Sequence, residues 1–358
     1  MPHRIYAAIS GHGLGHLAQT AAVLNALRNR VPDLELVVQS ALPEADVRRH
    51  IDGAFALIAE SADVGLVMAS ALDVLVEPTL AAYRAFHDNW PERVRIEAER
   101  LDALGVDAVL ADVPYLTCAA GARAGVPTLA LCSLNWADIF QHYCGGLPGA
   151  ERIRAEILAA YNAADGFLQP APAMAMPMLG NTQRIGPLGR IGHGERDRLA
   201  GRLGLGANTR LVMVSLGGLP MRLPLEDWPV DPQLHFIVPA SCGVHRADMT
   251  ALDDLGLSYL DAMCSCDALL TKLGYGHVTD AACNDIPVLY VERGDWPEEP
   301  VLRDWLQQHG RCVAIARTDL MRGAMTEPLA RLLAQPSRAK VMPSGVDQAV
   351  DALLAYLV

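Results

Sequence analysis

The stretch RIYAAISGHGLGHLAQTAAVLNAL (Arg4–Leu27) decides the fold class of this chain. Its opening residues, Arg4–Ile9, form an apolar run that predicts a buried strand. Glycines alternating with histidines follow, and then an amphipathic helix pattern begins, with one face formed by Leu17, Thr20, Ala21, Leu24 and Leu27. A strand that runs through a glycine-rich turn into a helix is the opening unit of a parallel sheet covered by helices.

The alternation of strand and helix continues along the chain and then starts again. In the first half a long helix is predicted over Leu80–Leu104, and further strands at Leu34–Val38, Ala54–Ile58, Ala108–Ala111 and Thr128–Cys132. The second half opens on VMVSLGGLP, a strand whose glycine-rich turn contains Gly217 and Gly218. Its strands are predicted at Leu211–Ser215, Leu234–Val238, Leu257–Leu260, Ala268–Thr271, Val288–Val291 and Cys312–Ile315. The sequence therefore predicts an α/β protein with two similar halves.

Domain boundaries follow from a break in this pattern. Residues 169–194 concentrate proline, glycine and methionine without periodicity, which is typical of a linker. We predict an N-terminal domain over 1–168, this linker, a C-terminal domain over 195–345 and a last helix over 346–358. Ligands of such folds bind beyond the carboxyl ends of the strands, so two such domains facing each other are expected to hold a site in the cleft between them.

Composition disfavours several classes of partner. The 358 residues carry a net charge of -12, which disfavours nucleic acid or an anionic membrane as a main partner. The eight cysteines lack CxxC spacing, and this favours free thiols in a reduced, cytoplasmic compartment. Neither a signal peptide nor an integral membrane segment is expected, because no apolar run is long enough.

The first glycine turn can be tested against three kinds of site. Gly11, Gly13 and Gly15 resemble a dinucleotide fingerprint, but His16 replaces its third glycine and the next strand ends without an acidic residue. A zinc site lacks a third ligand in the sequence. The remaining interpretation is a phosphate- or oxyanion-binding turn whose imidazole takes a proton from a hydroxyl group. His16 is the stronger candidate base and His12 the second; the alternative is that they only cap or line the turn.

A second loop, TKLGYGHVTDAACNDIPVLYVERGDWPEEP, spans Thr271–Pro300. After a predicted strand, Lys272, Gly274 and Gly276 precede a helix that begins near His277 and carries Asp280, so an anion-binding helix N-terminus is expected. Lys272 would place an ammonium near a phosphate, unless it is a solvated loop residue, and Tyr275 is open to a packing role. The carboxylates of Glu298 and Glu299 suit hydrogen bonds to sugar hydroxyls, with a solvated acidic loop as the alternative.

These segments together carry a resemblance. SGHGLGH, ADVPYLTCAAGARAGVPTLALCSLNW, KLGYGHVTDAACNDIPVLYVERGDWPEEPVLRDWL and ARTDLMRG occur in this order. The set resembles glycosyltransferases of the GT-B fold, and more closely the glycosyltransferase-like region that precedes the kinase domain in plant L-arabinokinases. The resemblance covers most of the chain. It implies two Rossmann-like domains facing across a cleft, with a last helix that crosses back to the first domain, and it implies no sugar kinase activity.

The resemblance also implies roles for individual residues. Gly274, Gly276 and the following helix start would hold the donor diphosphate, and Glu298 and Glu299 match an acidic pair in the donor-sugar region. The donor-binding set of the chain further takes in Gly13, Gly15, Gly217, Gly218, Lys272, Tyr275, His277 and Asp280. His16 matches a general base of inverting members, Asp112 a residue that orients it, and Asn135 and Asp138 the acceptor side. The chain departs from the family where His277 replaces a threonine and Asp280 replaces a glutamate.

The expected function is transfer of a sugar from a nucleotide-sugar to a small-molecule or glycan acceptor, with inversion at the sugar. No cofactor and no metal is required by this scheme, because backbone amides and Lys272 supply the positive field. Two alternatives remain: a nucleotide-sugar epimerase, which uses the same fold, and a non-catalytic nucleotide-sugar-binding protein.

Overall fold

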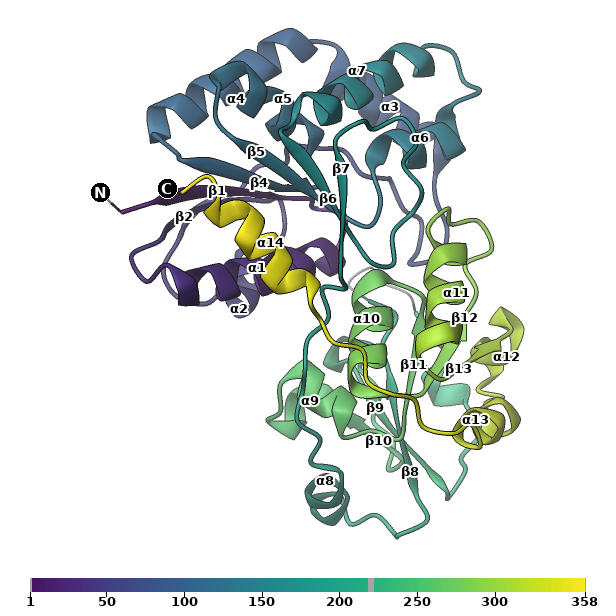
Figure 1. Ribbon diagram of the computed structural model, residues 1–358. Helices are drawn as coiled ribbons and strands as arrows, with labels where there is room; N and C mark the ends of the chain where they lie inside the picture. The colour runs from purple at the N-terminus through teal and green to yellow at the C-terminus, as the bar shows by residue number, and fades with distance from the viewer. Residues whose placement is uncertain (1, 218–221, 358) are drawn as a thin grey trace. The chain divides into compact units, whose positions relative to one another are not determined.

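The structure, a computed structural model, describes residues 2–217 and 222–357. It divides into two compact units (Figure 1). Unit 1 comprises Met1–Leu188 and Ser344–Val358, and unit 2 comprises Gly189–Pro343. The C-terminal segment thus belongs to the same unit as the N-terminus.

Unit 1 is built on a parallel sheet of seven strands in the order β3-β2-β1-β4-β5-β6-β7. The strands are β1 (Arg4–Ile9), β2 (Glu35–Gln39), β3 (Ala56–Ile58), β4 (Ala108–Asp112), β5 (Thr128–Leu131), β6 (Gly166–Pro170) and β7 (Thr182–Ile185). In the interior strand β1, every residue from Ile5 to Ile9 is at most 1% exposed, as expected for a strand covered on both faces. Because all strands run the same way, their carboxyl ends share one edge of the sheet.

Helices cover both faces of this sheet (Figure 1). One face carries α3 (Val76–His87), α4 (Trp90–Leu104), α5 (Tyr115–Ala124), α6 (Trp136–Cys144) and α7 (Ala150–Ala163), and the other α1 (Leu14–Arg30), α2 (Glu44–His50) and α14 (Gly345–Leu354). The last helix, α14, packs on α1. It is held by Gln348, whose Oε1 accepts a 2.6 Å hydrogen bond from the Gly186 amide, and by a 3.3 Å ion pair between Asp351 and Arg30.

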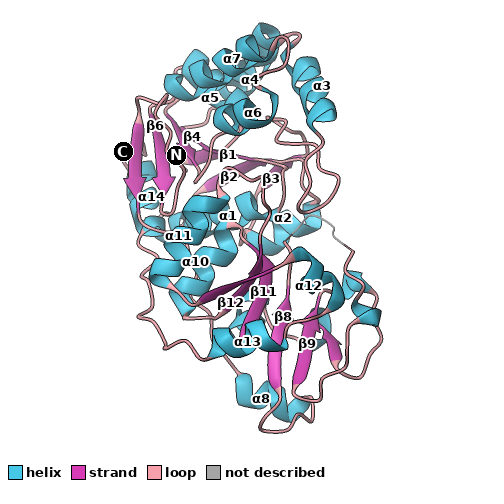
Figure 2. Ribbon diagram, turned by 90° about the vertical axis from the view of Figure 1, so that its right-hand side faces the viewer, coloured by secondary structure: helices cyan, strands magenta, loops and turns pink. Residues whose placement is uncertain are grey.

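Unit 2 repeats the architecture with six strands in the order β10-β9-β8-β11-β12-β13, all parallel (Figure 2). They are β8 (Arg210–Val214), β9 (Leu234–Val238), β10 (Met249–Ala251), β11 (Ala268–Lys272), β12 (Val288–Val291) and β13 (Cys312–Ile315). Its helices are α8 (Arg196–Arg202), α9 (Tyr259–Cys264), α10 (Tyr275–Asn284), α11 (Glu299–His309), α12 (Arg317–Arg322) and α13 (Thr326–Leu333).

Three local predictions are corrected by the structure. Leu257–Leu260 is not a strand, because the Ser258 side chain accepts a 3.1 Å hydrogen bond from the Asp261 amide and so starts helix α9. The helix predicted over Leu80–Leu104 is two helices, and the second has a proline in its first turn. The stretch 169–194 is not linker throughout, since it contains the end of β6 and all of β7.

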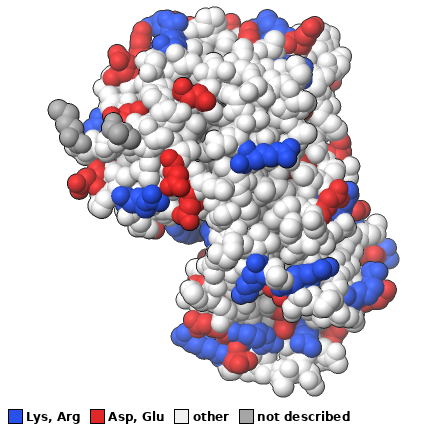
Figure 3. All heavy atoms as spheres, in the orientation of Figure 1, with Lys and Arg blue, Asp and Glu red and all other residues white. Residues whose placement is uncertain are grey.

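The surface and the thiols agree with the composition. On the face in Figure 3, acidic and basic side chains are interspersed instead of gathering into one basic surface. All eight cysteines are free. None of the helices in residues 2–217 and 222–357 combines the length and the apolar character that a bilayer span needs.

Candidate active site

The first glycine turn of unit 1 lies at the carboxyl end of β1. Gly13 has a φ of 120°, which favours glycine, and it is the N-cap residue that precedes α1. A Cβ added at Gly13 or Gly15 would meet no described atom within 4 Å, so the turn has open space beside it. His16 lies in the first turn of α1 and is only 7% exposed.

His16 and Asp112 form a buried pair. Asp112 ends β4, which lies beside β1 in the sheet, and its Oδ1 is 2.9 Å from His16 Nδ1. Its Oδ2 accepts a 3.0 Å hydrogen bond from the Thr20 hydroxyl, one helical turn beyond His16. Burial raises the pKa of Asp112, while the hydrogen bonds from His16 and Thr20 act in the opposite direction. A tautomer with its proton on Nδ1, directed at Asp112, would leave Nε2 of His16 as the nitrogen that accepts a proton.

Cys132, which follows β5, completes a group that resembles a metal site. Within the part of the chain that the structure describes, His16, Asp112 and Cys132 place a nitrogen, an oxygen and a sulfur within 4.8 Å of one another. Such donors suit zinc. The sequence offered no third ligand for a zinc site, and the folded chain supplies a third candidate in Cys132. That the protein needs no metal stays a prediction.

His12 has a different neighbourhood. Its Nδ1 accepts a 3.2 Å hydrogen bond from the Leu66 amide, and its ring meets that of Trp136 edge-on, with centroids 5.1 Å apart. Leu66 belongs to the segment 59–75 after β3, which we call the 59–75 loop. In that loop a Cβ added at Gly65 would lie 2.9 Å from His12 Cβ. His12 therefore anchors this loop over the glycine turn.

The two acceptor-side candidates cap a helix. Asn135 precedes α6, and its Oδ1 accepts a 2.9 Å hydrogen bond from the Asp138 amide. Its Nδ2 donates to Asp138 Oδ2 at 2.8 Å, so the two side chains satisfy each other. This explains why these residue types occur here, and contact with an acceptor stays a prediction.

In unit 2, two glycine turns flank Lys272. Lys272 ends β11, and Gly217 follows the neighbouring strand β8 with a φ of 83°. A Cβ at Gly217 would lie 3.6 Å from Lys272 Cε, so glycine allows the lysine stem to pass closely. Gly218 lies outside the described residues. Burial and the positive charge of Arg293 lower the pKa of Lys272 to about 7, against the effect of the carboxylates that follow β12.

Helix α10 begins three residues after Lys272. Gly274 precedes the helix, and a Cβ at Gly274 or Gly276 would meet no described atom within 4 Å. The backbone amides of the first turn therefore border open space, as an anion site at a helix N-terminus requires. Tyr275 is only 4% exposed, which supports the packing role that the sequence left open.

His277 takes part in a hydrogen-bond network beneath this turn. Its Nε2 lies 2.8 Å from the Tyr259 hydroxyl, which is also 2.8 Å from Ser215 Oγ, and its Nδ1 lies 2.7 Å from Thr271 Oγ1. Burial, followed by the charge of Lys272, lowers the pKa of His277 to about 4, so the imidazole is neutral at pH 7. His277, which stands where the family has threonine, thus connects Ser215 after β8 with Thr271 in β11 through hydrogen bonds between neutral side chains.

Asp280 is paired inside unit 2. Its Oδ1 accepts a 2.8 Å hydrogen bond from the Arg190 amide and its Oδ2 a 2.5 Å bond from the Arg190 guanidinium, and the residue is 2% exposed. The sequence suggested Asp280 at a site where a longer acidic side chain contacts the nucleotide. In the structure Asp280 fixes the chain that enters unit 2 through Arg190, and its contact with a nucleotide stays a prediction.

Replacing Asp280 by alanine is expected to lower the free energy of unfolding by about 3 kcal/mol, because it leaves the Arg190 guanidinium without its partner. Urea denaturation measures this. Asp304→Ala is the matched control: its carboxylate is 69% exposed and, among the described residues, pairs with the neighbouring Arg303, so a change below about 0.5 kcal/mol is expected. Unchanged stability together with weaker nucleotide binding would contradict the structural role.

The acidic pair holds the loop after β12. Glu299 Oε2 accepts a 2.7 Å hydrogen bond from the Arg293 amide, and Glu298 Oε2 a 3.2 Å bond from the Trp296 indole. Both residues are at most 5% exposed. Glu299 borders a cavity of about 200 Å³, which is lined by Glu292, Gly294, Trp296, Glu299, Pro300 and Arg303. Contact of the acidic pair with sugar hydroxyls stays a prediction.

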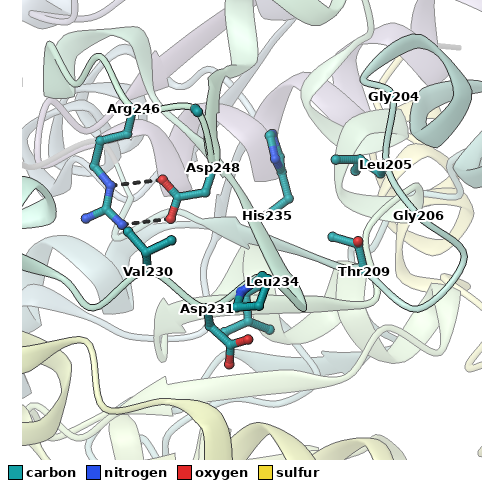
Figure 4. Close-up of a pocket in the computed structure, with 12 residues that line it drawn as sticks. Gly204, Leu205, Gly206, Thr209, Val230, Asp231, Leu234, His235, Arg246 and Asp248 are labelled. Atoms are coloured by element: carbon teal, nitrogen blue, oxygen red, sulfur yellow. Dashed lines mark hydrogen bonds and ion pairs between the residues drawn. The ribbon is translucent and has the colours of Figure 1, made fainter.

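A second cavity of unit 2, of about 380 Å³, lies at the opposite edge of the sheet (Figure 4). Its lining includes Thr209, Leu234 and Asp248, which stand at the amino ends of β8, β9 and β10. Arg246 and Asp248 pair with each other there at 2.7 Å. It is therefore separate from the residues that the sequence singled out.

Two residues of the unit 1 site were not identified from the sequence. Asp63, in the 59–75 loop, and Trp136, the first residue of α6, are joined by a 2.7 Å hydrogen bond from the indole nitrogen to Asp63 Oδ2. Asp63 has no periodic pattern around it, and its partner is 73 residues away in the chain. Only the three-dimensional structure brings them to the histidines.

We compared the sequence of the chain with those of known proteins. No family model matches the sequence. It is similar to an L-arabinokinase of Arabidopsis thaliana, with 25% identity over 337 residues, which cover 90% of this chain and 31% of that protein. The chain therefore spans less than a third of the length of this relative.

Solved structures share the architecture. CalG4, a calicheamicin glycosyltransferase, gives a TM-score of 0.63 at 16% identity over 100% of this chain and 99% of that one. LpCGTa, solved with UDP, gives 0.62 at 12% identity over 100% of both chains. A protein of Listeria monocytogenes described as a candidate UDP-N-acetylglucosamine 2-epimerase gives 0.56 at 12% identity, covering 100% of this chain and 96% of that one. The chain has the GT-B fold of these glycosyltransferases, with two Rossmann-like α/β domains.

Proposed function

We propose that this protein is an inverting glycosyltransferase that moves a sugar from a nucleotide-sugar to a hydroxyl group of a small-molecule or glycan acceptor. The observation that carries the proposal is the buried pair of His16 and Asp112 at the glycine turn, 2.9 Å apart. An imidazole oriented in this way by a carboxylate is suited to act as a general base.

On the acceptor side, Nε2 of His16 takes the proton of the acceptor hydroxyl as its oxygen attacks the anomeric carbon of the donor. The new bond forms on the face opposite to the leaving diphosphate, so a single displacement inverts the configuration. Asp112 holds the imidazole through Nδ1 and stabilises the imidazolium that forms. Thr20 fixes the second carboxylate oxygen of Asp112, which limits rotation of the pair.

On the donor side, the bond between the anomeric carbon and the diphosphate oxygen breaks, and its electrons stay on the diphosphate. Unit 2 offers the amides at the start of α10 and the Lys272 ammonium to this developing charge. The UDP carried by the structural neighbour LpCGTa supports a nucleotide-linked donor. In this scheme the backbone amides and Lys272 supply the positive field. A binding test identifies the nucleotide base and the sugar of the donor.

A panel of nucleotides and nucleotide-sugars, scored by thermal shift and ligand-observed NMR, tests the proposal. We expect at least one nucleotide-sugar to raise the melting temperature, because a ligand that binds only the folded state stabilises it by mass action. The absence of binding by every member would contradict both the transferase and the epimerase.

Turnover then separates the enzyme classes. Release of nucleoside diphosphate that depends on an acceptor supports a transferase, and interconversion of donor sugars without an acceptor supports an epimerase. Binding without either reaction would leave a nucleotide-sugar-binding protein. The anomeric configuration of the product, read by NMR coupling constants, tests inversion.

A further inference from the structure

Asp63 is a buried carboxylate beside the His16–Asp112 pair. It lies in the 59–75 loop and is 4% exposed. Its Oδ2 accepts the 2.7 Å hydrogen bond from the Trp136 indole, and the Ser61 hydroxyl lies 2.7 Å from its carbonyl oxygen and 3.4 Å from its Oδ1. The indole N–H can only donate, and a carboxylate that accepts such bonds is favoured in its ionised form.

The same loop and the same indole reach both histidines. The Trp136 ring centroid lies 5.1 Å from that of His12 and 5.8 Å from that of His16. The Leu66 amide, three residues after Asp63, donates to His12 Nδ1. Asp63 therefore fixes the aromatic ring that packs against the histidines, from a loop that is itself tied to the glycine turn.

The electrostatic surroundings of the pair come from several elements. Burial raises the pKa of Asp63, and Ser10, the charge of His16 and Trp136 lower it, so Asp63 and His16 act on each other. Asp112 faces His16 from β4 and Cys132 faces it from the end of β5. Asp63 interacts electrostatically with three tyrosine phenols, those of Tyr83 in α3, Tyr115 in α5 and Tyr161 in α7. Burial raises the pKa of each phenol well above its usual value. The phenols are therefore neutral, which leaves the carboxylates of Asp63 and Asp112 as the members of this group that can carry a negative charge.

We propose that Asp63 is a positioning residue of this centre, a second carboxylate that stabilises the imidazolium of His16 by its charge and holds the Trp136 ring against it. The inference rests on the proposed function, in which His16 takes a proton from the acceptor. One carboxylate, Asp112, orients the imidazole through a direct hydrogen bond. The other, Asp63, acts without touching the imidazole proton and makes proton acceptance more favourable.

The test is a histidine titration followed by NMR on the intact protein, with His16→Gln used to assign the His16 signal. In Asp63→Asn the amide keeps an oxygen for the Trp136 indole but lacks the negative charge. We expect the titration midpoint of His16 to fall by about one pH unit, a tenfold loss of proton affinity. Glu60→Gln is the control, because it removes an exposed carboxylate three residues earlier, bound to Arg100 at 2.7 Å. Its midpoint should equal that of the unmodified protein.

A second variant guards against misfolding of the first. Trp136→Phe retains Asp63 and removes the indole donor that favours its charged form, so a smaller fall of the His16 midpoint in the same direction is expected. An unchanged midpoint in whichever of these variants folds would overturn the inference.

Kinetics distinguish this inference from the proposed function. With a turned-over donor, the acidic limb of the pH–rate profile should move down with the midpoint in Asp63→Asn, and an unmoved limb would overturn the role of Asp63 while leaving the transferase standing. A shifted midpoint in a protein that turns over no donor supports the coupling of Asp63 to His16 and counts against the proposed function alone.

Discussion

His16→Ala is expected to lower the turnover of the nucleotide-sugar by about a hundredfold to ten-thousandfold, the range that general base catalysis contributes. The dissociation constant of the donor should stay within about twofold, because the residues that we assign to the diphosphate belong to unit 2. Steady-state release of nucleoside diphosphate measures the first quantity and calorimetry the second.

The physical reason lies in the position of the imidazole. His16 is 7% exposed and tied through Nδ1 to a carboxylate that is fully buried, so its orientation is set before a substrate arrives. Alanine removes the proton acceptor and leaves Asp112 without that partner. A water molecule in the vacated space is a far weaker base than an imidazole.

His12→Ala is the matched control, since it removes the same side chain from the same turn. Because His12 Nδ1 accepts from the Leu66 amide and its ring packs on Trp136, its loss should loosen the 59–75 loop and reduce turnover less than the loss of His16. Equal losses of turnover and donor affinity in His16→Ala would show that His16 is a structural or donor-binding residue instead. A larger loss in the control would exchange the roles of the two histidines.

The strands that the sequence predicted are those with an apolar run. β9 and β12 have the predicted bounds because a strand inside a parallel sheet must be apolar on both faces. β13 also has the predicted bounds, although it is the edge strand of its sheet. β7, with the sequence TQRI, is an edge strand whose first three residues are exposed, so it has no apolar run to recognise. At α9 the apolar pattern predicted a strand, but a helix forms. The Ser258 side chain accepts a hydrogen bond from the Asp261 amide, which is unpaired within the first turn of the helix.

The site residues divide in a similar way. The positions of His16 and Lys272 in the fold were predictable because each stands at a glycine turn where a strand gives way to a helix, and this local pattern fixes the sheet edge on which they lie. The hydrogen-bond partners of Asp280 and Glu299 were not predictable. Arg190 and the Arg293 amide come into contact with these carboxylates only when the chain is folded. An acidic residue type indicates a need for positive partners or donors, and only the structure shows whether the protein itself supplies them.

Lys272→Met is expected to weaken nucleotide-sugar binding by about tenfold to a hundredfold at pH 6, which is the value of a charge-assisted hydrogen bond. The pKa of Lys272, lowered to about 7, makes the effect depend on pH. Below pH 7 the free protein carries the ammonium that a diphosphate attracts, and above it the amine is neutral. A bound diphosphate raises this pKa, so binding takes up a proton and the affinity of the unmodified protein should fall as pH rises from 7 to 8.5.

The lowered pKa of Lys272 also determines how the stability of the free protein changes with pH. In the unfolded chain the lysine keeps its usual pKa of 10.5, so above pH 7 the unfolded state holds the extra proton and the contribution of Lys272 to stability rises with pH. Stability and donor affinity should therefore change in opposite directions over this range. A general loss of structure at high pH would lower both, so the two measurements together isolate Lys272.

Calorimetry in two buffers of different ionisation enthalpy measures the proton uptake directly. A nucleotide-sugar is the right ligand, because its diphosphate is a diester and does not itself titrate between pH 6 and 8.5. Lys340→Met is the control, since Lys340 is the only other lysine of the chain and is exposed in unit 2. The control should keep both the affinity and the proton uptake, and Lys272→Met should lose both. If Lys272→Met bound as tightly as the control at pH 6, the amides at the start of α10 would be sufficient to hold the diphosphate, and the lysine would have no part in donor binding.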